Sequence, residues 1–386
     1  MHVVFFSYVD LSGSSGENVF SRELIAAIAR QPGVRLSVIT PEPKDPIPDA
    51  VGAPLKNYFF LPSKRSGDIT WHLSIQRTTA SLLRSAVKQY GQPEGFVTTL
   101  RTSTIAAPIL SFTTGTPQVL VVEGLESKNV SRMTSIPGAG AVMSSVAWLN
   151  ALRSRQVLAA YAAIEEWIGR LPFVDRAKIE IFSHGVDVSA FPQRGIECTR
   201  RDLGIPFGSQ DFVVGFVGSY KWYHSLDILV RALARPELRD MKCILVGTGP
   251  QQDEIDRLIA ELCLADRVLQ TGAVPHSEIS KYIGACDVMY GARAPEHWSN
   301  PIKLIEYLAA GRAVVGYRTA EVAFIEEEGV GILLDEVTAV SVAATLLKFQ
   351  SLGRSRLEQM GGKARKLVIE TRTWDCLASR IIGIFE

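Results

Sequence analysis

The sequence predicts an α/β fold of two domains, each built around a parallel sheet. The chain has 386 residues, more than one hydrophobic core usually holds. Near its start, an apolar strand at 3–7 is followed by a glycine-rich turn at 13–16, a helical pattern at 17–30 and a strand at 34–40. Strand, turn, helix and strand in this order are typical of a parallel sheet. Later in the chain, the apolar run at 211–217 ends at a glycine and is followed by another apolar helix, which repeats the pattern.

Composition excludes several classes of protein. Apolar residues make up 47% of the chain and charged residues 21%, as in folded soluble proteins. The formal net charge is +1, which gives no indication of a general nucleic-acid binder. The five cysteines form no close pair and have no metal-ligand spacing, so we expect reduced, mostly buried thiols in a cytoplasmic protein. The apolar run at 3–8 is too short for a membrane span or a signal core.

The stretch at 295–311 is the most informative part of the chain and predicts a loop that turns into a helix. Ser299 or Asn300 can cap the helix, and Pro301 suits the first helical position because it needs no N–H donor there. Gly311 is expected to end the helix. The apolar residues at helical spacing, which predict the buried face, are Ile302, Ile305, Leu308 and Ala309.

The residues at the start of this helix indicate which ligand groups it could bind. The free N–H groups of a helix N-terminus attract phosphate or sugar oxygens. Lys303 adds a cation in the first turn, and the Glu306 carboxylate could accept hydrogen bonds from the two hydroxyls of a ribose. From these residues alone, a capped helix with Lys303 and Glu306 in solvent is an equal alternative.

The sequence from residue 300 to 311 is Asn-Pro-Ile-Lys-Leu-Ile-Glu-Tyr-Leu-Ala-Ala-Gly. It resembles the donor-binding motif of the family-4 retaining glycosyltransferases, which have the two-domain GT-B fold. In that family, the Glu matching Glu306 holds the ribose of a nucleotide-sugar, and amides of the helix start meet the sugar and its phosphate. The common pattern has a second Glu where this chain has Trp298. The resemblance therefore leaves the contacts to the sugar hydroxyls to Glu296, His297, Ser299, Asn300 or backbone amides.

Two further segments match places where the family binds its donor. The turn Gly13, Ser14, Ser15 and Gly16 stands where the family has a glycine-rich loop near the donor phosphate, although an ordinary turn is equally consistent with these residues. After the strand at 211–217, Ser219 and His224 stand where other members carry an Arg and a Lys that bind the diphosphate, and Lys221 fits the Gly-Ser-x-Lys-x-x-His pattern of a branch of the family. We expect Lys221 and His224 to share the diphosphate role, with Lys221 as a solvated charge being the alternative. The remaining donor contacts expected by resemblance are Gly249 and Val274.

Glu123 is the candidate catalytic residue of the first half. It follows the apolar strand at 118–122, where many members carry a His at the sugar-transfer centre. Its carboxylate could orient an acceptor hydroxyl or act as a base, or it could merely cap a turn. Its role is therefore open from the sequence.

Domain boundaries are predicted from composition and from a junction motif. Residues 179–187 resemble the segment that joins the two domains in the family. We expect an acceptor-binding domain at 1–187, a linker at 188–210, a nucleotide-sugar-binding domain at 211–363 and a helix at 364–386 that returns to the first domain. The resemblance implies that the two Rossmann-like domains face each other across a cleft. Within the first domain we expect a loop at 41–62 and one long helix at 147–169.

The resemblance implies a retaining hexosyltransferase that moves a sugar from a UDP- or GDP-sugar to an acceptor hydroxyl, in polysaccharide, glycolipid or natural-product glycoside synthesis. No DxD-type acidic pair ends a strand, so we expect neither a metal nor a cofactor beyond the nucleotide-sugar co-substrate. We expect a cytoplasmic enzyme, and the basic helix at 71–90 leaves a peripheral contact with the inner membrane face open. The alternatives are a nucleotide-sugar epimerase of the same fold and a non-catalytic or partner-dependent subunit.

Overall fold

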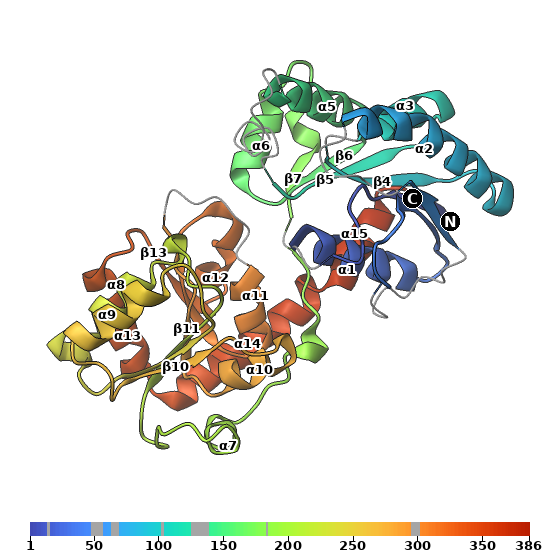
Figure 1. Ribbon diagram of the computed structural model, residues 1–386. Helices are drawn as coiled ribbons and strands as arrows, with labels where there is room; N and C mark the ends of the chain where they lie inside the picture. The colour runs from blue at the N-terminus through green and yellow to red at the C-terminus, as the bar shows by residue number, and fades with distance from the viewer. Residues whose placement is uncertain are drawn as a thin grey trace. The chain divides into compact units, whose positions relative to one another are not determined.

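The computed structural model contains two compact units, which divide the chain at two points (Figure 1). Unit 1 comprises Met1–Gly185 and Trp374–Glu386, and unit 2 comprises Val186–Thr373. The structure describes residues 1–13, 16–47, 57–62, 69–101, 104–124, 139–182, 184–294 and 302–386.

Unit 1 is built on a seven-stranded parallel sheet whose strand order is β3-β2-β1-β4-β5-β6-β7. The order reverses between β1 and β4, so the chain winds outward from the middle of the sheet in both directions. The strands are β1 (His2–Phe6), β2 (Arg35–Pro41), β3 (Tyr58–Leu61), β4 (Gly95–Thr99), β5 (Gln118–Val122), β6 (Gln156–Ala159) and β7 (Ile179–Ile181). The helices are α1 (Gly16–Arg30), α2 (Ile69–Tyr90), α3 (Ala106–Thr114), α5 (Ala139–Arg153), α6 (Ala162–Gly169) and the C-terminal α15 (Trp374–Gly383).

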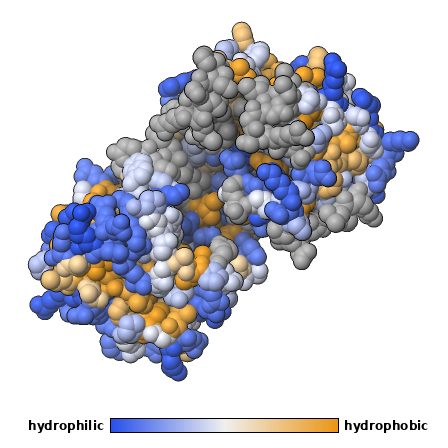
Figure 2. Space-filling model, in the orientation of Figure 1, coloured by the Kyte–Doolittle hydropathy of each residue, from blue (hydrophilic) through white to orange (hydrophobic). Residues whose placement is uncertain are grey.

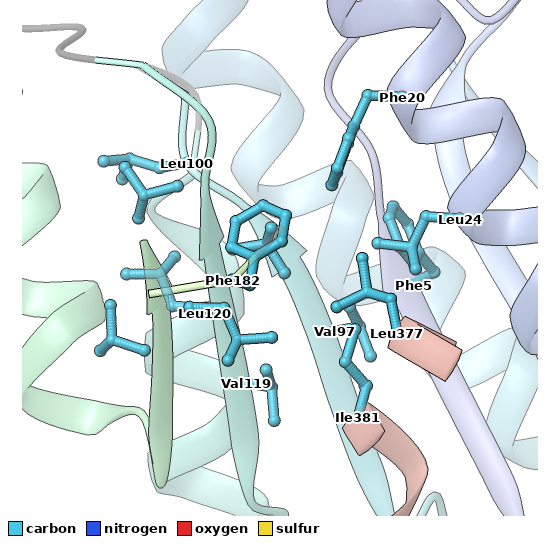
Figure 3. Packing of buried hydrophobic residues seen from close by; sticks show 14 of the residues in the cluster. Phe5, Phe20, Leu24, Val97, Leu100, Val119, Leu120, Phe182, Leu377 and Ile381 are labelled. Atoms are coloured by element: carbon cyan, nitrogen blue, oxygen red, sulfur yellow. The ribbon is translucent and has the colours of Figure 1, made fainter. Parts of the chain in front are cut away.

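The C-terminal helix α15 is part of the core of unit 1. Leu377 and Ile381 from α15 lie among buried side chains of α1 and the central strands (Figure 3). The ring of Phe385 lies so close to the start of β4 that a Cβ at Gly95 would be 2.5 Å from it. Each large apolar side chain buried here contributes about 1.5–3 kcal/mol to folding. The last residues of the chain therefore stabilise the domain that contains the first ones.

Two predicted elements of unit 1 were wrong. The segment at 41–62, expected as loop, contains the edge strand β3 (Tyr58–Leu61). The segment at 147–169, expected as one helix, is the end of α5, the strand β6 and helix α6. Val157, Leu158 and Ala159 are fully buried in β6. A short apolar run that is buried on both faces has no strand periodicity, so the pattern alone could not distinguish it from a helix.

Unit 2 has a six-stranded parallel sheet with the order β10-β9-β8-β11-β12-β13, and apolar clusters cover both of its faces. The strands are β8 (Val213–Val217), β9 (Lys242–Val246), β10 (Val268–Gly272), β11 (Val288–Tyr290), β12 (Ala313–Tyr317) and β13 (Gly331–Leu334). The helices are α7 (Ile196–Asp202), α8 (Leu226–Leu233), α9 (Gln252–Glu261), α10 (His276–Gly284), α11 (Ile302–Ala309), α12 (Phe324–Glu327), α13 (Ala339–Leu352) and α14 (Arg354–Thr371).

The domain boundaries differ from those expected. The segment at 188–210 belongs to unit 2, because its helix α7 carries Arg200, whose buried guanidinium bonds to Asp287 at 2.7 Å and to the Ala285 carbonyl at 2.8 Å. Helix α14 also belongs to unit 2, where Ala364 and Val368 are buried. The return to unit 1 therefore begins at residue 374 rather than at 364.

Surface and thiol chemistry complete the description. Hydrophilic residues separate the hydrophobic areas on the visible face, in keeping with the burial of large apolar side chains in the two cores (Figure 2). Within the described ranges, no helix is both long and apolar enough to cross a membrane. None of the five cysteines, all of which lie in the described ranges, forms a disulfide. Cys243 and Cys286 are buried, but Cys198 and Cys263 are exposed, against the expectation of mostly buried thiols.

Candidate functional site

The point where the strand order of unit 2 reverses lies between β8 and β11. In open parallel sheets, the loops after the two strands at such a point diverge and leave room for a ligand beyond the carboxyl ends. The loop after β8 carries Lys221 and His224, and the chain after β11 leads into α11 with Lys303 and Glu306. Lys221, His224, Lys303 and Glu306, all predicted for the donor site, thus belong to two segments at one edge of the sheet.

Helix α11 is fastened to the end of β8 by a buried tyrosine. The Tyr307 hydroxyl accepts a hydrogen bond from the Val217 N–H at 2.9 Å and donates one to the Val217 carbonyl at 3.1 Å. The buried residues of the helix are Leu304, Ile305, Tyr307, Leu308 and Ala309. This face confirms most of the predicted stripe, but Ile302 is 39% exposed, since the packing begins only at Leu304. Gly311 adopts φ +73° and ends the helix as predicted.

The loop after β8 is held close to the loop after β9. The Tyr220 N–H donates to the Thr248 carbonyl at 3.0 Å. A Cβ at Gly249 would lie 2.5 Å from the Tyr220 nitrogen and 2.8 Å from the Ser219 hydroxyl, so only glycine permits this approach. Gly249, predicted as a donor contact, therefore supports the loop that carries Ser219 and Lys221. Val274, in the loop after β10, packs against an apolar cluster on one face of the sheet.

Lys303 and His224 meet at this edge. The Lys303 Nζ lies 3.2 Å from Nδ1 and 3.1 Å from Nε2 of His224, and 4.3 Å from the centre of the Phe216 ring. Gly218, at φ +148°, leaves room for the ammonium, because a Cβ there would be 3.0 Å from Nζ. Burial lowers the pKa of Lys303 to about 7, while the nearby Glu306 carboxylate acts to raise it.

Lys221 lies in the same loop but is exposed. Its Nζ is 5.8 Å from the centre of the Tyr223 ring, and that ring lies 4.4 Å from the His224 ring. The sequence predicts that Lys221 and His224 bind the diphosphate of the donor together. In the structure, His224 contacts Lys303 from the other segment.

In unit 1, Glu123 lies at the carboxyl end of β5 and its side chain is only 8% exposed. It forms an ion pair at 3.3 Å with Arg101, which follows β4, and Arg101 also pairs at 3.3 Å with Glu17 in the first turn of α1. Sequence analysis missed Arg101. Its position directly after the apolar run of β4 was the available signal, because strand carboxyl ends share one edge of the sheet.

The described part of the glycine-rich turn lies at the same edge of unit 1. The Gly13 N–H donates to the Asp10 carbonyl at 3.1 Å, and Arg22 Nη1 donates to the Gly13 and Leu11 carbonyls at 2.5 and 2.8 Å. Gly16 is the first residue of α1. These contacts attach the chain at residues 10–13 to helix α1.

Several predicted site residues lie outside the described residues. They are Ser14, Ser15, Glu296, His297, Trp298, Ser299, Asn300 and Pro301. Within the ranges that the structure covers, no group of three or more His, Cys, Asp and Glu side chains is arranged to hold a metal ion.

Comparisons with known proteins agree with this arrangement. Residues 203–367 match the family "Glycosyl transferases group 1". Over 219 residues the chain is 26% identical to 2-deoxystreptamine N-acetyl-D-glucosaminyltransferase of Streptomyces fradiae, a match that covers 55% of this chain and 51% of that protein. The chain thus spans about half the length of this curated relative.

Solved structures match along the whole chain. Sucrose-phosphate synthase from Thermosynechococcus elongatus is 18% identical with a TM-score of 0.71, covering 100% of this chain and 98% of that one. Anabaena Alr3699/HepE in complex with UDP-glucose is 18% identical with a TM-score of 0.65, covering 99% and 98%. These likenesses show the fold, and the family match covers the part of the chain that holds Lys303 and His224. We conclude that the chain has the GT-B fold and that its residues 203–367 resemble the group 1 glycosyl transferases.

Proposed function

We propose that this protein is a retaining glycosyltransferase that moves a sugar from a UDP- or GDP-sugar to an acceptor hydroxyl. The observation that carries the proposal is the contact of Lys303 with His224 at the carboxyl end of β8, with Glu306 on the same helix. These residues lie within the part of the chain that matches the group 1 glycosyl transferases. Two nitrogen bases and one carboxylate at a switch point suit a ligand with a diphosphate and a ribose.

The diphosphate is assigned to the space beside Lys303, His224 and Lys221. Hydrogen bonds between cations and phosphate oxygens are about twice as strong as neutral ones, and burial strengthens them further. Positive charge placed here stabilises the nucleotide as the bond between the sugar and the phosphate breaks. Glu306 is assigned to the ribose hydroxyls, and the resemblance assigns His297, Ser299 and Asn300 to the sugar.

The acceptor is assigned to the strand ends of unit 1, where the ion pair of Glu123 and Arg101 lies. The ion pair with Arg101 orients the Glu123 carboxylate, so that it can accept a hydrogen bond from an acceptor hydroxyl. In the proposed reaction, the acceptor oxygen bonds to the anomeric carbon on the face that the phosphate leaves. The departing phosphate oxygen takes the hydroxyl proton, which retains the configuration.

We propose that cations rather than a required metal carry the leaving charge, and that the enzyme acts in the cytoplasm. The Streptomyces relative acts, by its name, on 2-deoxystreptamine, which supports a polyhydroxylated small molecule as one acceptor class. Polysaccharide and glycolipid acceptors remain in the proposal.

The experiment that tests the function is a donor screen. The purified protein is incubated with UDP-glucose, UDP-N-acetylglucosamine and GDP-mannose, each with 2-deoxystreptamine or a simple sugar as acceptor and with or without EDTA. We expect nucleotide release that an acceptor accelerates and that EDTA does not reduce. In NMR spectra of the product, the new linkage should have the same anomeric configuration as the donor. Epimerised donor, or binding without transfer, would replace this proposal by one of the alternatives. The variant Glu306→Gln tests the site, and Lys348→Met on α13 is the control.

A further inference from the structure

Lys303 and His224 are too close for both to carry a full positive charge in the unliganded protein. The Lys303 Nζ approaches both ring nitrogens of His224, at 3.2 and 3.1 Å. A neutral imidazole offers one nitrogen as an acceptor for an ammonium proton, whereas an imidazolium offers none. Two unit charges at this distance repel each other strongly in a half-buried place. The contact therefore favours no more than one positive charge on the two side chains.

Among the described residues, aromatic rings and backbone atoms line this contact. Phe216 of β8 presents its ring to Lys303 at 4.3 Å and to His224 at 5.5 Å. The loop after β8 adds the Gly218 backbone and the Tyr223 ring, which is 4.4 Å from His224. Burial lowers the pKa of Lys303 to about 7, and the acidic group that raises it is Glu306 on α11. Lys221 in the same loop is a further cation.

From this geometry we propose that Lys303, in contact with His224, takes up a proton when the diphosphate of a nucleotide-sugar binds. The inference rests on the proposed function, since it takes the ligand to be that donor. An anion beside the pair stabilises the ammonium form of Lys303, so this side chain is cationic in the complex. Donor binding and protonation are then linked, and each favours the other.

The linkage gives a definite pH dependence. The complex holds more protons than the free protein wherever pH lies above the free pKa of the pair and below its pKa in the complex. With Lys303 at about 7 in the free protein, donor affinity should fall as pH rises above that value, by up to about tenfold per pH unit for one proton. Nucleotide-sugars suit the measurement, because their phosphodiester groups stay ionised and supply no proton near neutrality.

The test is isothermal titration calorimetry of the full chain with UDP-glucose, UDP-N-acetylglucosamine and GDP-mannose at pH 8, in HEPES and in Tris. These buffers differ in ionisation enthalpy, so the difference in binding heat counts the protons taken up. Because Lys303 is mostly neutral at pH 8 in the free protein, we expect about 0.5–1 proton per donor bound.

Lys303→Arg is the decisive variant, because a guanidinium keeps its charge at all working pH values. It should still bind the donor but with no measurable proton uptake and a flatter affinity between pH 7 and 9. Lys348→Arg places the same substitution on an exposed lysine of α13 and should keep the wild-type uptake.

Each outcome decides between the two proposals. Donor binding without proton uptake in the wild type overturns the inference and leaves the proposed function standing. Wild-type uptake in Lys303→Arg overturns the assignment to this pair. Failure of every donor to bind overturns the proposed function, and this inference falls with it.

Discussion

Asp287 should contribute strongly to the stability of unit 2, although it lies at the opposite end of the strands from the proposed donor site. Its side chain is fully buried and comes directly before β11. One carboxylate oxygen accepts from Arg200 Nη2 at 2.7 Å and from the Val213 N–H at 2.8 Å, and the other accepts from Arg354 Nε at 3.1 Å. It thus links α7, β8 and α14 to β11.

Asp287→Ala removes these bonds and leaves the Arg200 guanidinium, only 3% exposed, without a counter-charge. Removing one partner of a buried ion pair costs about 3–5 kcal/mol, because the remaining charge stays desolvated. A unit of this size loses about 2–4 °C per kcal/mol, so its unfolding midpoint should fall by roughly 6–20 °C.

Calorimetry together with hydrogen exchange can measure this effect, since a chain of two units need not unfold in one step. Exchange should accelerate in peptides from β8 and β11 and stay unchanged in peptides from β1. The matched control is Asp335→Ala, whose exposed carboxylate pairs with Arg318 and should contribute less than about 1 kcal/mol. A loss below about 1 kcal/mol for Asp287→Ala would refute the reasoning, because it would mean that desolvation cancels the whole network.

Three further predictions concern the proposed reaction. Glu306→Gln should weaken nucleotide and nucleotide-sugar binding alike by about 1.5–3 kcal/mol, the range for a charge-assisted hydrogen bond, and unchanged affinity in calorimetry would remove the ribose role. Lys221→Ala should lower turnover more than donor affinity if the cation acts on charge that grows as the bond breaks, whereas normal turnover in steady-state kinetics would return this exposed lysine to a surface role. Glu123→Gln should slow transfer to the acceptor while donor binding stays as in the wild type; equal loss of both would place Glu123 in a structural role beside Arg101.

The sequence by itself determined most of unit 2. Parallel strands covered on both faces read as continuous apolar runs, and those at 213–217 and 242–246 are followed by glycines that adopt positive φ. Helix α11 and its end at Gly311 were predicted from spacing and from the glycine. These features are local, because propensity, periodicity and turn chemistry act over a few residues.

Only the tertiary structure decided which side chains meet. Lys303 and His224 are 79 positions apart, and Arg101 and Glu123 are 22 apart; each pair lies at one edge of a sheet because strand order places the loops there. The buried bond between Arg200 and Asp287 connects α7 to unit 2, although composition predicts a linker for this segment. The C-terminal helices divide between the two units at residue 374. Each helix belongs to the unit whose core buries its apolar face, and this depends on long-range packing that no local pattern encodes.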